Sequence, residues 1–511
     1  MSTFTAFNPR SGAADGPTFV EATTEDIRAA ALRAAAAFQR WRLVPARDRA
    51  AALRAVADAL IAAQDEIVTT VDREAALGKP RIVSELGRTV GQLRGFADLL
   101  DEGNYVEAII DRADPSTTPP RPELRRVLHP LGPVAVFTPS NFPLAYGVVG
   151  GDTAGALAAG CPVLVKGHPS QPATSELITR LARAVLDAVP GGRDVLQLVH
   201  GRTPETGRAV VNAPEITAVG FTGSVAAGRA LFNVAAARPE PIPFYGELGS
   251  LNPVFISPGA LAERSADIVA GLTTSVTTGA GQFCTKPGLI FVPQGDSGHA
   301  FADALAKSFD TAPVGVLLNE NIKHLLANKM QATMFVQGAT CATERDWPSD
   351  RGFHVSPTLF VTDDATFTAS PELREEHFGP LSVVVLCSPE HMPIIATELG
   401  GHLTGTIHAT ADESVWASSL SAALSQHVGR IIWNGYPTGV AVVPAMQHGG
   451  PYPSSTSSLH SAVGTTSIRR FLRPVAYQNV PDSLLPIELR AANPLGIERI
   501  VNGQRTTDPL R

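Results

Sequence analysis

The chain has 511 residues, of which 44% are hydrophobic and 17% charged, and its formal net charge is −7 at neutral pH. This length and composition support large hydrophobic cores in two or three domains and exclude an intrinsically disordered chain. The net negative charge offers no basic surface for nucleic acid or anionic lipid, so neither kind of partner is expected.

The cysteine content and the N-terminus bear on the cellular compartment. The chain has four cysteines and no CxxC pair; they are Cys161, Cys284, Cys341 and Cys387. This pattern predicts neither a disulfide framework nor a thiolate zinc site, and no metal is expected. The start MSTFTAFNPR lacks the features of a secretory signal, and glycines and a charge interrupt the apolar region 144–165. We therefore expect a cytoplasmic protein without a membrane span.

Two amphipathic helices are predicted near the N-terminus. The first begins at Thr24, a residue that can cap a helix, and its apolar positions recur at helical spacing up to Phe38. Pro45 ends it, and a second apolar stripe runs from Leu53 to Ile61. Further along, the connection between Thr117 and Pro130, which contains TPPRPELRRVLHP, is proline-rich and β-like, so we expect an arm there rather than part of a core.

From residue 131 onward, short apolar runs alternate with helical patterns. The runs of the first group are GPVAVFTP, PVLVKG, DVLQLVHG and ITAVGFTG. This rhythm predicts a parallel sheet covered by helices, with ligands at the carboxyl ends of its strands. Beyond Gly249 the rhythm resumes with PVFIS, PGLIFVP, PLSVVVLCS, LTGTIHAT and GRIIWNG, which predicts a second α/β unit.

Two strand ends of the first unit carry candidate cofactor-binding residues. In AVGFTGSVAAGRAL, a strand ends at Gly223 and a helix begins at Ser224, with Gly228 one turn further. Such a junction lets backbone N–H groups approach a phosphate, although the spacing equally suits an ordinary tight turn. In VLVKGHPSQPATSE, Lys166 ends another strand, where it is either a ribose or phosphate contact or a solvated surface charge.

Three residues are candidates for catalysis. Glu247 in FYGELGSLNP follows a strand among apolar and small neighbours, which would raise its pKa and suit a general base; a capping carboxylate is the alternative. Asn141 in TPSNFPLA could donate to an oxyanion or simply form a turn. Cys284 in GQFCTKPG lies in a predicted loop, which favours a reactive thiol, whereas Cys161 and Cys387 in apolar runs fit inert burial.

Seven motifs, in order and across nearly the whole chain, resemble those of the aldehyde dehydrogenase superfamily. They are SNFP, VKGHP, FTGS, GELGS, GQFCT, EEHFGP and NGYPTG. The resemblance implies an α/β fold with a Rossmann-type parallel-sheet cofactor domain (1–114 and 131–246) and a second α/β catalytic domain (247–440). It also implies a β-arm and C-terminal extension for oligomerisation (115–130 and 441–511), and hence a homodimer or homotetramer.

The resemblance implies a role for each matching residue. Cys284 would be the nucleophile, Glu247 the general base, and Asn141 the oxyanion donor together with the backbone N–H of Cys284. An aldehyde would be oxidised to a carboxylic acid through a thiohemiacetal and a thioester, with hydride passing to nicotinamide. Matching residues would hold the cofactor; they are Lys166, Gly223, Ser224, Gly228, Glu376 and Phe378.

Longer segments resemble one branch of the superfamily, the 2,5-dioxovalerate (α-ketoglutaric semialdehyde) dehydrogenases. Among them are MQHGGPYPSS, SAVGTTSIRRFLRPVAYQNVP and ANPLGIERIVNG, and HGGPYPSSTSS stands in place of the common PFGGxxxSG. This branch oxidises 2,5-dioxopentanoate to 2-oxoglutarate. NADP-dependent long-chain aldehyde dehydrogenases share several of these features. A cysteine acyl-transfer enzyme and a catalytically silent relative are alternatives of other classes, and the latter is disfavoured because all three catalytic positions are present.

The sequence departs from the family pattern at one position that bears on the choice between NAD and NADP. Many NAD-preferring members carry a glutamate three residues after the strand-end lysine, and this chain has Pro169 there. Because no carboxylate repels a 2′-phosphate, we expect NADP, with NAD also possible, and Arg202 or His168 would help to hold the phosphate.

The sequence leaves two alternatives for the part of the site that binds the substrate's tail. Arg88 and Arg94 are candidates to bind a substrate carboxylate, although a surface ion pair is the simpler role for each. A long-chain aldehyde would instead need an apolar tunnel, to which Phe142, Phe96 and Phe283 could contribute.

Overall fold

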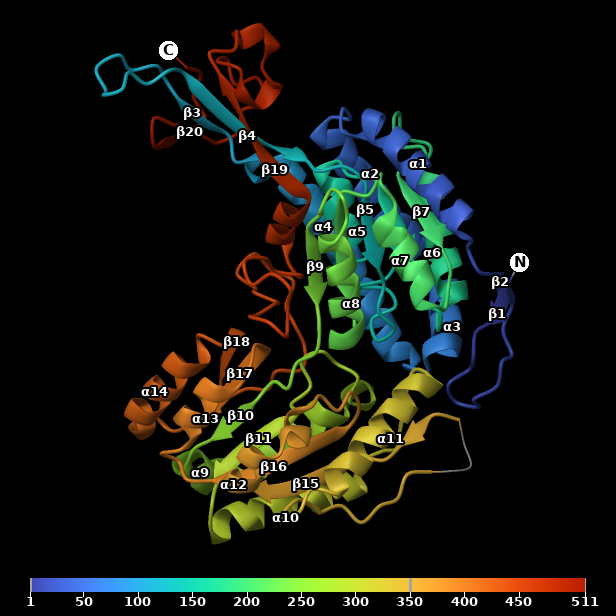
Figure 1. The fold of residues 1–511 in the computed structure, drawn as a ribbon, viewed down its shortest axis with the longest axis vertical. Helices are drawn as coiled ribbons and strands as arrows, with labels where there is room; N and C mark the ends of the chain where they lie inside the picture. The colour runs from blue at the N-terminus through green and yellow to red at the C-terminus, as the bar shows by residue number, and fades with distance from the viewer. Residues whose placement is uncertain (1, 349–351, 511) are drawn as a thin grey trace.

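The computed structural model describes residues 2–348 and 352–510, which form three large sheets (Figure 1). The first sheet has the order β7-β6-β5-β8-β9 and is parallel throughout. Its strands are β5 (Val134–Phe137), β6 (Val163–Lys166), β7 (Leu196–Val199), β8 (Ala218–Thr222) and β9 (Phe244–Glu247). The first four are the predicted strands of the cofactor-type unit.

Helices cover both faces of this sheet because successive side chains of a strand point in opposite directions. In β5, Val134 and Val136 join the cluster on one face, and Ala135 and Phe137 join the cluster on the other. The helices α5 (Gly151–Ala159) and α6 (Pro172–Leu186) cover the first face, with α2 (Ala46–Ala62), α3 (Gln64–Ala75) and α4 (Lys79–Glu102) behind them. The second face is covered by α1 (Thr24–Trp41), α7 (Pro204–Asn212) and α8 (Val225–Ala236).

The start of α1 corrects one detail of the sequence prediction. The capping residue is Thr23 rather than Thr24, because the side chain of Thr23 accepts from the backbone N–H of Asp26. The carboxylate of Asp26 in turn accepts from the backbone N–H of Thr23. This reciprocal pair satisfies two N–H groups at the helix start.

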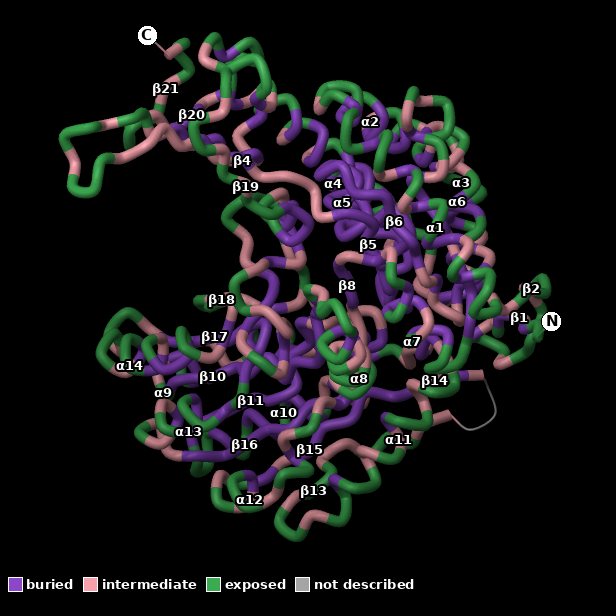
Figure 2. Tube along the Cα trace, turned by 45° about the horizontal axis from the view of Figure 1, so that its top comes forward, coloured by how far each residue is buried: buried purple, intermediate pink, exposed green. Residues whose placement is uncertain are grey.

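The second sheet has the order β13-β15-β16-β11-β10-β17-β18 and is parallel except at β13. Its strands are β10 (Val254–Ile256), β11 (Leu289–Pro293), β13 (Thr340–Cys341), β15 (Thr358–Asp363), β16 (Leu381–Cys387), β17 (His402–His408) and β18 (Val428–Trp433). One face packs on α9 (Pro258–Thr277) and α10 (Asp296–Thr311), and the other on α12 (Asp364–Ala369), α13 (Met392–Glu398) and α14 (Ser414–Leu424). The strands of both large sheets are mostly buried (Figure 2).

The third sheet, ordered β19-β4-β3-β20-β21, projects away from the other two (Figure 1). Its strands are β3 (Ile109–Asp111), β4 (Leu124–Pro130), β19 (Leu472–Gln478), β20 (Arg499–Val501) and β21 (Gln504–Thr506). The predicted proline-rich segment supplies β4, which pairs antiparallel with β19. The predicted fold class, with two α/β units and a β-arm, is therefore confirmed.

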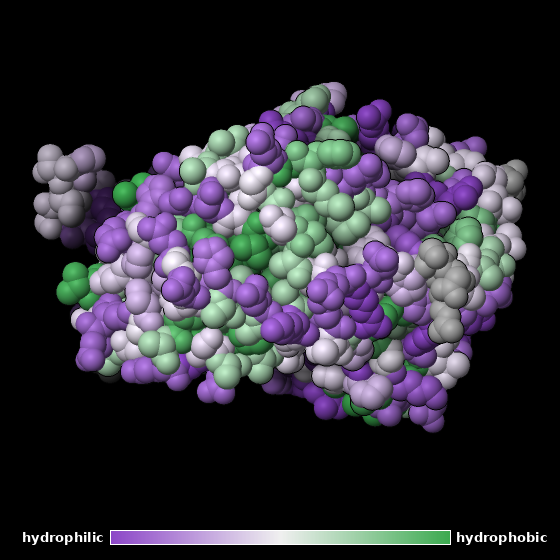
Figure 3. Space-filling view, turned by 90° about the horizontal axis from the view of Figure 1, so that it is seen from below, coloured by the Kyte–Doolittle hydropathy of each residue, from purple (hydrophilic) through white to green (hydrophobic). Residues whose placement is uncertain are grey.

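Several smaller elements complete the structure. They are β1 (Thr3–Thr5) with β2 (Thr18–Val20), β12 (Gly315–Val316) with β14 (His354–Val355), and α11 (Glu320–Met334). Polar and apolar residues are interspersed on the face seen in Figure 3. Within the described ranges, no helix is both long enough and apolar enough to span a bilayer.

Candidate active site

Three side chains from distant parts of the sequence meet between the two large sheets. Glu247 ends β9, Cys284 lies in the loop before β11, and His448 belongs to the irregular segment after β18. Nε2 of His448 lies 2.9 Å from Oε1 of Glu247 and 3.4 Å from Sγ of Cys284. Glu247 and His448 are buried, whereas Cys284 is half-buried. A thiol thus contacts a carboxylate–imidazole pair, as an activated nucleophile requires.

The electrostatics of this cluster correct the sequence prediction for Glu247. Burial alone would raise its pKa, but the charge and hydrogen bond of His448, with a smaller contribution from Cys284, outweigh burial and lower it. Burial, followed by the negative charge of Glu247, raises the pKa of the Cys284 thiol well above its usual range. Glu247 is therefore an ionised base beside a protonated thiol, and it is placed to accept the thiol's proton.

Consecutive left-handed residues shape the loop that carries Cys284. Gly279, Ala280 and Gly281 have φ values of 59°, 55° and 67°. A side chain at Gly281 would clash with the backbone of Gly379, so only glycine allows this close approach. The contact joins the cysteine loop to the EEHFGP segment.

Asn252 fixes the other side of the cysteine loop. Its Nδ2 donates to the backbone carbonyl of Cys284 at 2.8 Å and to that of Lys286 at 3.0 Å. The Asn252 side chain is fully buried, so these bonds are protected from water. They hold the nucleophile's backbone in place.

Asn141 lies just beyond β5, as predicted, and is buried. Its Nδ2 donates to the carbonyl of Gln282, two residues before Cys284, at 3.0 Å. The bond ties the end of β5 to the cysteine loop. An amide nitrogen carries two N–H groups, so the second is available to an oxyanion formed at Cys284.

The first group of predicted cofactor residues lies at the carboxyl ends of β6 and β8. Ser224 caps α8, since its hydroxyl accepts from the N–H of Ala227, and Gly223 precedes it. Gly228 is packed against the side chains of Leu248 and Phe221. Lys166 ends β6, and burial lowers its pKa to about 8. Its ammonium makes no hydrogen bond within the described ranges, so a ribose hydroxyl or phosphate would supply the missing partner.

The second group comes from the other α/β unit. Oε1 of Glu376 accepts from the N–H of Ser250 at 3.3 Å, and a side chain at Gly249 would press on its Oε2. Burial raises the pKa of Glu376. Phe378 is half-buried two residues further on. The absence of a side chain at Gly249 lets the Glu376 carboxylate pack this close to the backbone, so Gly249 and Ser250 fix its position.

The residues proposed to bind the 2′-phosphate of NADP are less available for this contact than the sequence suggests. Pro169 lies in the loop after β6, as expected. Arg202 is already paired, because its Nε lies 2.8 Å from Oε1 of Glu21. Burial lowers the pKa of His168 to about 3, so His168 offers a neutral imidazole rather than a cation. Compared with Arg202 and His168, Lys166 is therefore the charged residue that has no carboxylate partner within 4 Å in the described ranges.

An aromatic cluster borders Cys284, and two arginines of α4 lie on it. The rings of Phe142 and Phe283 pack edge to face with centroids 5.1 Å apart. The guanidinium of Arg88 lies 5.4 Å from the ring centres of both Phe142 and Tyr146. That of Arg81 lies 4.5 Å from the centre of Phe283. Of the two predicted substrate arginines, Arg88 thus reaches the site.

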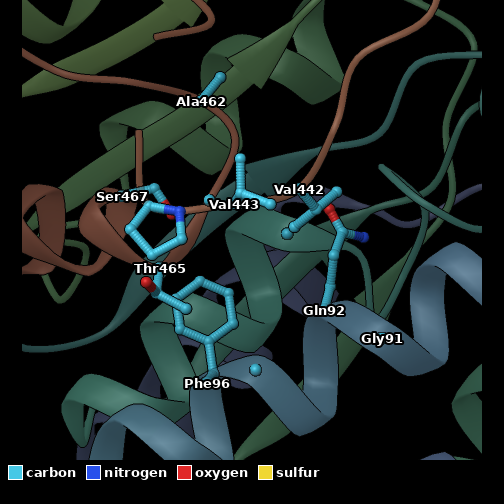
Figure 4. A pocket seen from close by; sticks show the side chains of 12 residues that line it. Gly91, Gln92, Phe96, Val442, Val443, Ala462, Thr465 and Ser467 are labelled. Atoms are coloured by element: carbon cyan, nitrogen blue, oxygen red, sulfur yellow. The ribbon is translucent and has the colours of Figure 1, made fainter. Parts of the chain in front are cut away.

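The structure does not bring Arg94 to this cluster. Arg94 is exposed, and its Nη2 lies 2.8 Å from Oδ1 of Asp58. Phe96 is likewise separate from the aromatic cluster. It lines a cavity of about 50 Å³ with Gln92, Val442 and Thr465 (Figure 4), which has room for a few water molecules but not for a long alkyl chain.

His448, Asn252 and Arg81 were not identified from the sequence. The sequence did contain a signal for His448, because HGGPYPSSTSS has this histidine at the position where the common motif PFGGxxxSG has phenylalanine. Arg81 lies seven residues before Arg88 and therefore on the same face of α4, two turns away. Nothing local in GELGSLNP marks Asn252 as a partner of the cysteine loop.

The parallel sheet with a helix N-terminus at its edge, together with a thiol, a carboxylate and an amide donor, is the arrangement expected of an enzyme that acts on carbonyl compounds through a cysteine. The chain belongs to the aldehyde dehydrogenase family, which its residues 2–474 match. It is an NAD(P)-dependent aldehyde dehydrogenase.

Individual relatives match over nearly the full length. Alpha-ketoglutaric semialdehyde dehydrogenase 2 of Azospirillum brasilense is 42% identical over 510 residues, covering 98% of this chain and 96% of that protein. Alpha-ketoglutaric semialdehyde dehydrogenase of Acinetobacter baylyi is 39% identical over 496 residues, covering 96% and 93%. The crystal structure of betaine aldehyde dehydrogenase from Staphylococcus aureus in complex with NAD⁺ has a TM-score of 0.80 at 22% identity, covering 94% and 92%, which supports the fold.

Proposed function

We propose that this aldehyde dehydrogenase oxidises 2,5-dioxopentanoate (α-ketoglutaric semialdehyde) to 2-oxoglutarate. The observation that carries the proposal is the 42% identity, over 98% of this chain, to a protein named for that substrate. Arg88 lies on the aromatic cluster and forms no ion pair within the described ranges, which also suits an aldehyde that bears a carboxylate.

The first half of the reaction forms a bond between Sγ of Cys284 and the aldehyde carbon. Glu247 takes the thiol proton as the sulfur attacks, because its carboxylate is ionised and adjacent. The negative charge that develops on the aldehyde oxygen is stabilised by the Asn141 amide and the backbone N–H of Cys284. His448 donates to Glu247 and keeps its carboxylate oriented towards the thiol.

A bound NAD(P)⁺ supplies the acceptor for the hydride that leaves the thiohemiacetal carbon. Lys166, Gly223, Ser224, Glu376 and Phe378 are the residues that would hold this cofactor. Once the proton taken from Cys284 has passed from Glu247 to solvent, the carboxylate accepts a proton from a water molecule that attacks the Cys284 thioester. It then returns this proton to the departing sulfur, which releases the carboxylic acid and restores the thiol. One carboxylate thus serves as base in both halves of the reaction.

NADP is the preferred cofactor in this proposal. Pro169 places no carboxylate three residues after Lys166, and the unpaired Lys166 ammonium is available to a 2′-phosphate. Arg202 would contribute only if it exchanged its bond with Glu21 for one with the phosphate.

A homodimer or homotetramer built through the β-arm completes the proposal. The strand β18 is an edge of the second sheet, with Ile431 and Trp433 exposed on it. Such an edge presents unpaired backbone groups and calls for a covering partner. Light scattering of the purified protein would give at least twice the mass of one chain, and a monomer would contradict this part.

The test of the substrate is a steady-state comparison of aldehydes with NADP⁺. The panel contains 2,5-dioxopentanoate, succinic semialdehyde, glutaraldehyde and decanal. We expect kcat/KM for 2,5-dioxopentanoate to exceed that of the others by about tenfold or more. A higher value for decanal would instead support the long-chain alternative.

A further inference from the structure

Arg88 forms no ion pair with any described residue, and it lies on the ring of Phe142, which packs against Phe283 beside Cys284. We propose that Arg88, together with the hydroxyl of Tyr146, forms a subsite that binds the carboxylate of the substrate. This inference rests on the proposed function, since it assigns the residues that recognise the acid end of an oxo-acid aldehyde. It extends the active site from the reacting carbon to the substrate's tail.

The unmet hydrogen-bonding capacity of Arg88 is the first argument. Its side chain is half-buried, and it forms no ion pair with any acid in the described ranges. Its Nε is buried without a hydrogen-bond partner, and its Nη2 contacts only the Tyr146 hydroxyl at a long 3.5 Å. Arg94 on the same helix shows the ordinary alternative, because it is exposed and paired with Asp58. A partly buried cation without an ionic partner is stabilised when a ligand supplies the opposite charge.

The second argument is the chemistry of the neighbouring Tyr146. The hydroxyl of Tyr146 is buried, and burial raises its pKa well above the usual range, so it remains a protonated donor. Its oxygen accepts from Nη2 of Arg88 at 3.5 Å, and its own O–H has no acceptor in the described part of the chain. The Tyr146 hydroxyl and the Arg88 guanidinium can therefore both donate to a ligand that only accepts. A carboxylate is such a ligand, and arginine binds it in a bidentate manner.

The third argument is the position of Arg88 relative to Cys284. Phe142 follows the oxyanion residue Asn141 directly, and its ring contacts both the Arg88 guanidinium and Phe283, the residue before Cys284. The positive charge of Arg88 favours the ionised forms of Cys284 and Glu247 and so opposes the effect of burial on both pKa values, which means that the guanidinium lies within electrostatic range of the reacting groups. A short substrate can therefore place its aldehyde at Cys284 and its carboxylate at Arg88.

The other charged groups on this face of α4 are bonded to the backbone of the Asn141 loop, although Nη1 of Arg81 and Oε2 of Glu85 are buried without a partner in the described ranges. Arg81 donates to the carbonyl of Asn141 at 2.8 Å and is held against Phe283. Oε1 of Glu85 accepts from the N–H groups of Leu144 and Ala145 at 2.8 and 3.0 Å. Arg81 is thus a positioning residue for the Asn141 loop, whereas no backbone carbonyl of the described residues holds the Arg88 guanidinium, which leaves Arg88 for a ligand.

The test compares substrates with and without a carboxylate in the wild type, Arg88→Met, Arg88→Lys and the matched control Arg94→Met. For each protein, kcat/KM is measured for 2,5-dioxopentanoate and for pentanal, a neutral aldehyde of the same carbon number. We expect Arg88→Met to lower the ratio of the two values by about 10- to 100-fold, mainly through KM for the oxo acid. Arg88→Lys should keep part of the preference, and Arg94→Met should keep all of it. Circular dichroism establishes that each variant is folded.

Equal losses on both aldehydes, with a shifted pH profile, would overturn the subsite and show that Arg88 acts on Cys284 and Glu247 instead. An unchanged ratio would also overturn it.

A second measurement separates this inference from the proposed function. Glutarate, which cannot be oxidised, should inhibit pentanal oxidation competitively in the wild type and about 10- to 100-fold less tightly in Arg88→Met. If the wild type rejects 2,5-dioxopentanoate, the proposed function fails while the glutarate result still decides the subsite. Equal inhibition of both proteins, or none of the wild type, would refute the subsite.

Discussion

His448 holds the carboxylate of Glu247 with its Nε2 2.9 Å from Oε1, and both side chains are almost completely shielded from solvent, with 1% and 2% of their surface exposed. In such surroundings a lone carboxylate would favour its protonated form. The imidazole reverses this preference, so that the base is ionised before the substrate arrives.

Replacing His448 by glutamine should therefore impair the base. Without the imidazole, burial dominates and the pKa of Glu247 rises. Because the ionised form is the active one, the acid limb of the pH profile of kcat/KM should move to higher pH. At neutral pH, kcat should fall by roughly tenfold or more.

The matched control for this experiment is His460→Gln. His460 lies in the same irregular segment, but its Nδ1 is bonded to Ser457 rather than to the reactive cluster. This variant should keep the wild-type pH profile. An unshifted acid limb in His448→Gln would show that the histidine does not control Glu247.

Replacing Cys284 by alanine should abolish oxidation, with a loss of about 10⁴-fold or more, because Cys284 is the one thiol of the described residues that lies beside Glu247. Cofactor binding, measured by quenching of protein fluorescence on addition of NADPH, should persist. Cys341→Ser is the control, since Cys341 is exposed on the edge strand β13 and should be dispensable. Substantial activity of Cys284→Ala would rule out the covalent route.

The thiol's raised pKa leads to a separate prediction for the free enzyme. Burial and Glu247 keep Cys284 protonated, so alkylation by iodoacetamide should be slow at neutral pH and should accelerate as the pH rises. The rate of activity loss at several pH values measures this. A fast, pH-independent inactivation would mean that the thiolate is already formed.

Sequence patterns predicted most of the fold and part of the site, and the difference has a physical cause. The strands β5 and β16 consist almost entirely of apolar residues, so the local sequence alone predicts that they are buried. The short, exposed strand β13 has no such apolar pattern. Asn141 and Glu247 could be placed because strand ends meet at one sheet edge. The pKa of Glu247 could not, because it depends on His448, 201 residues further along the chain.

Cofactor choice can be tested by placing a carboxylate at position 169. In Pro169→Glu, the new charge should repel a 2′-phosphate and lower the ratio of kcat/KM for NADP⁺ to that for NAD⁺ by roughly tenfold or more. Pro169→Gln separates the effect of charge from that of losing the proline, and it should leave the ratio close to that of the wild type. A wild type that accepts only NAD⁺ would contradict the proposed preference.

The last prediction concerns stability and the ion pair between Arg470 and Asp152. Nη2 of Arg470 lies 2.7 Å from Oδ1 of Asp152, and their side chains are only 3% and 9% exposed. The pair joins α5, under the first sheet, to the segment η5 (Thr465–Phe471) that leads into β19 of the arm. Breaking a buried pair leaves an uncompensated charge, so Asp152→Asn should lower the free energy of unfolding by about 3 to 5 kcal/mol.

The control uses an exposed pair of the same chemistry. Nη2 of Arg54 lies 2.7 Å from Oδ1 of Asp98, whose side chain is 73% exposed. Water and salt screen this pair, and Arg54 also contacts Asp101, so Asp98→Asn should change stability by less than about 1 kcal/mol. Urea unfolding followed by circular dichroism compares the two variants with the wild type. Equal losses would mean that burial does not set the strength of the Arg470–Asp152 pair, because both pairs have the same separation and differ in their exposure to solvent.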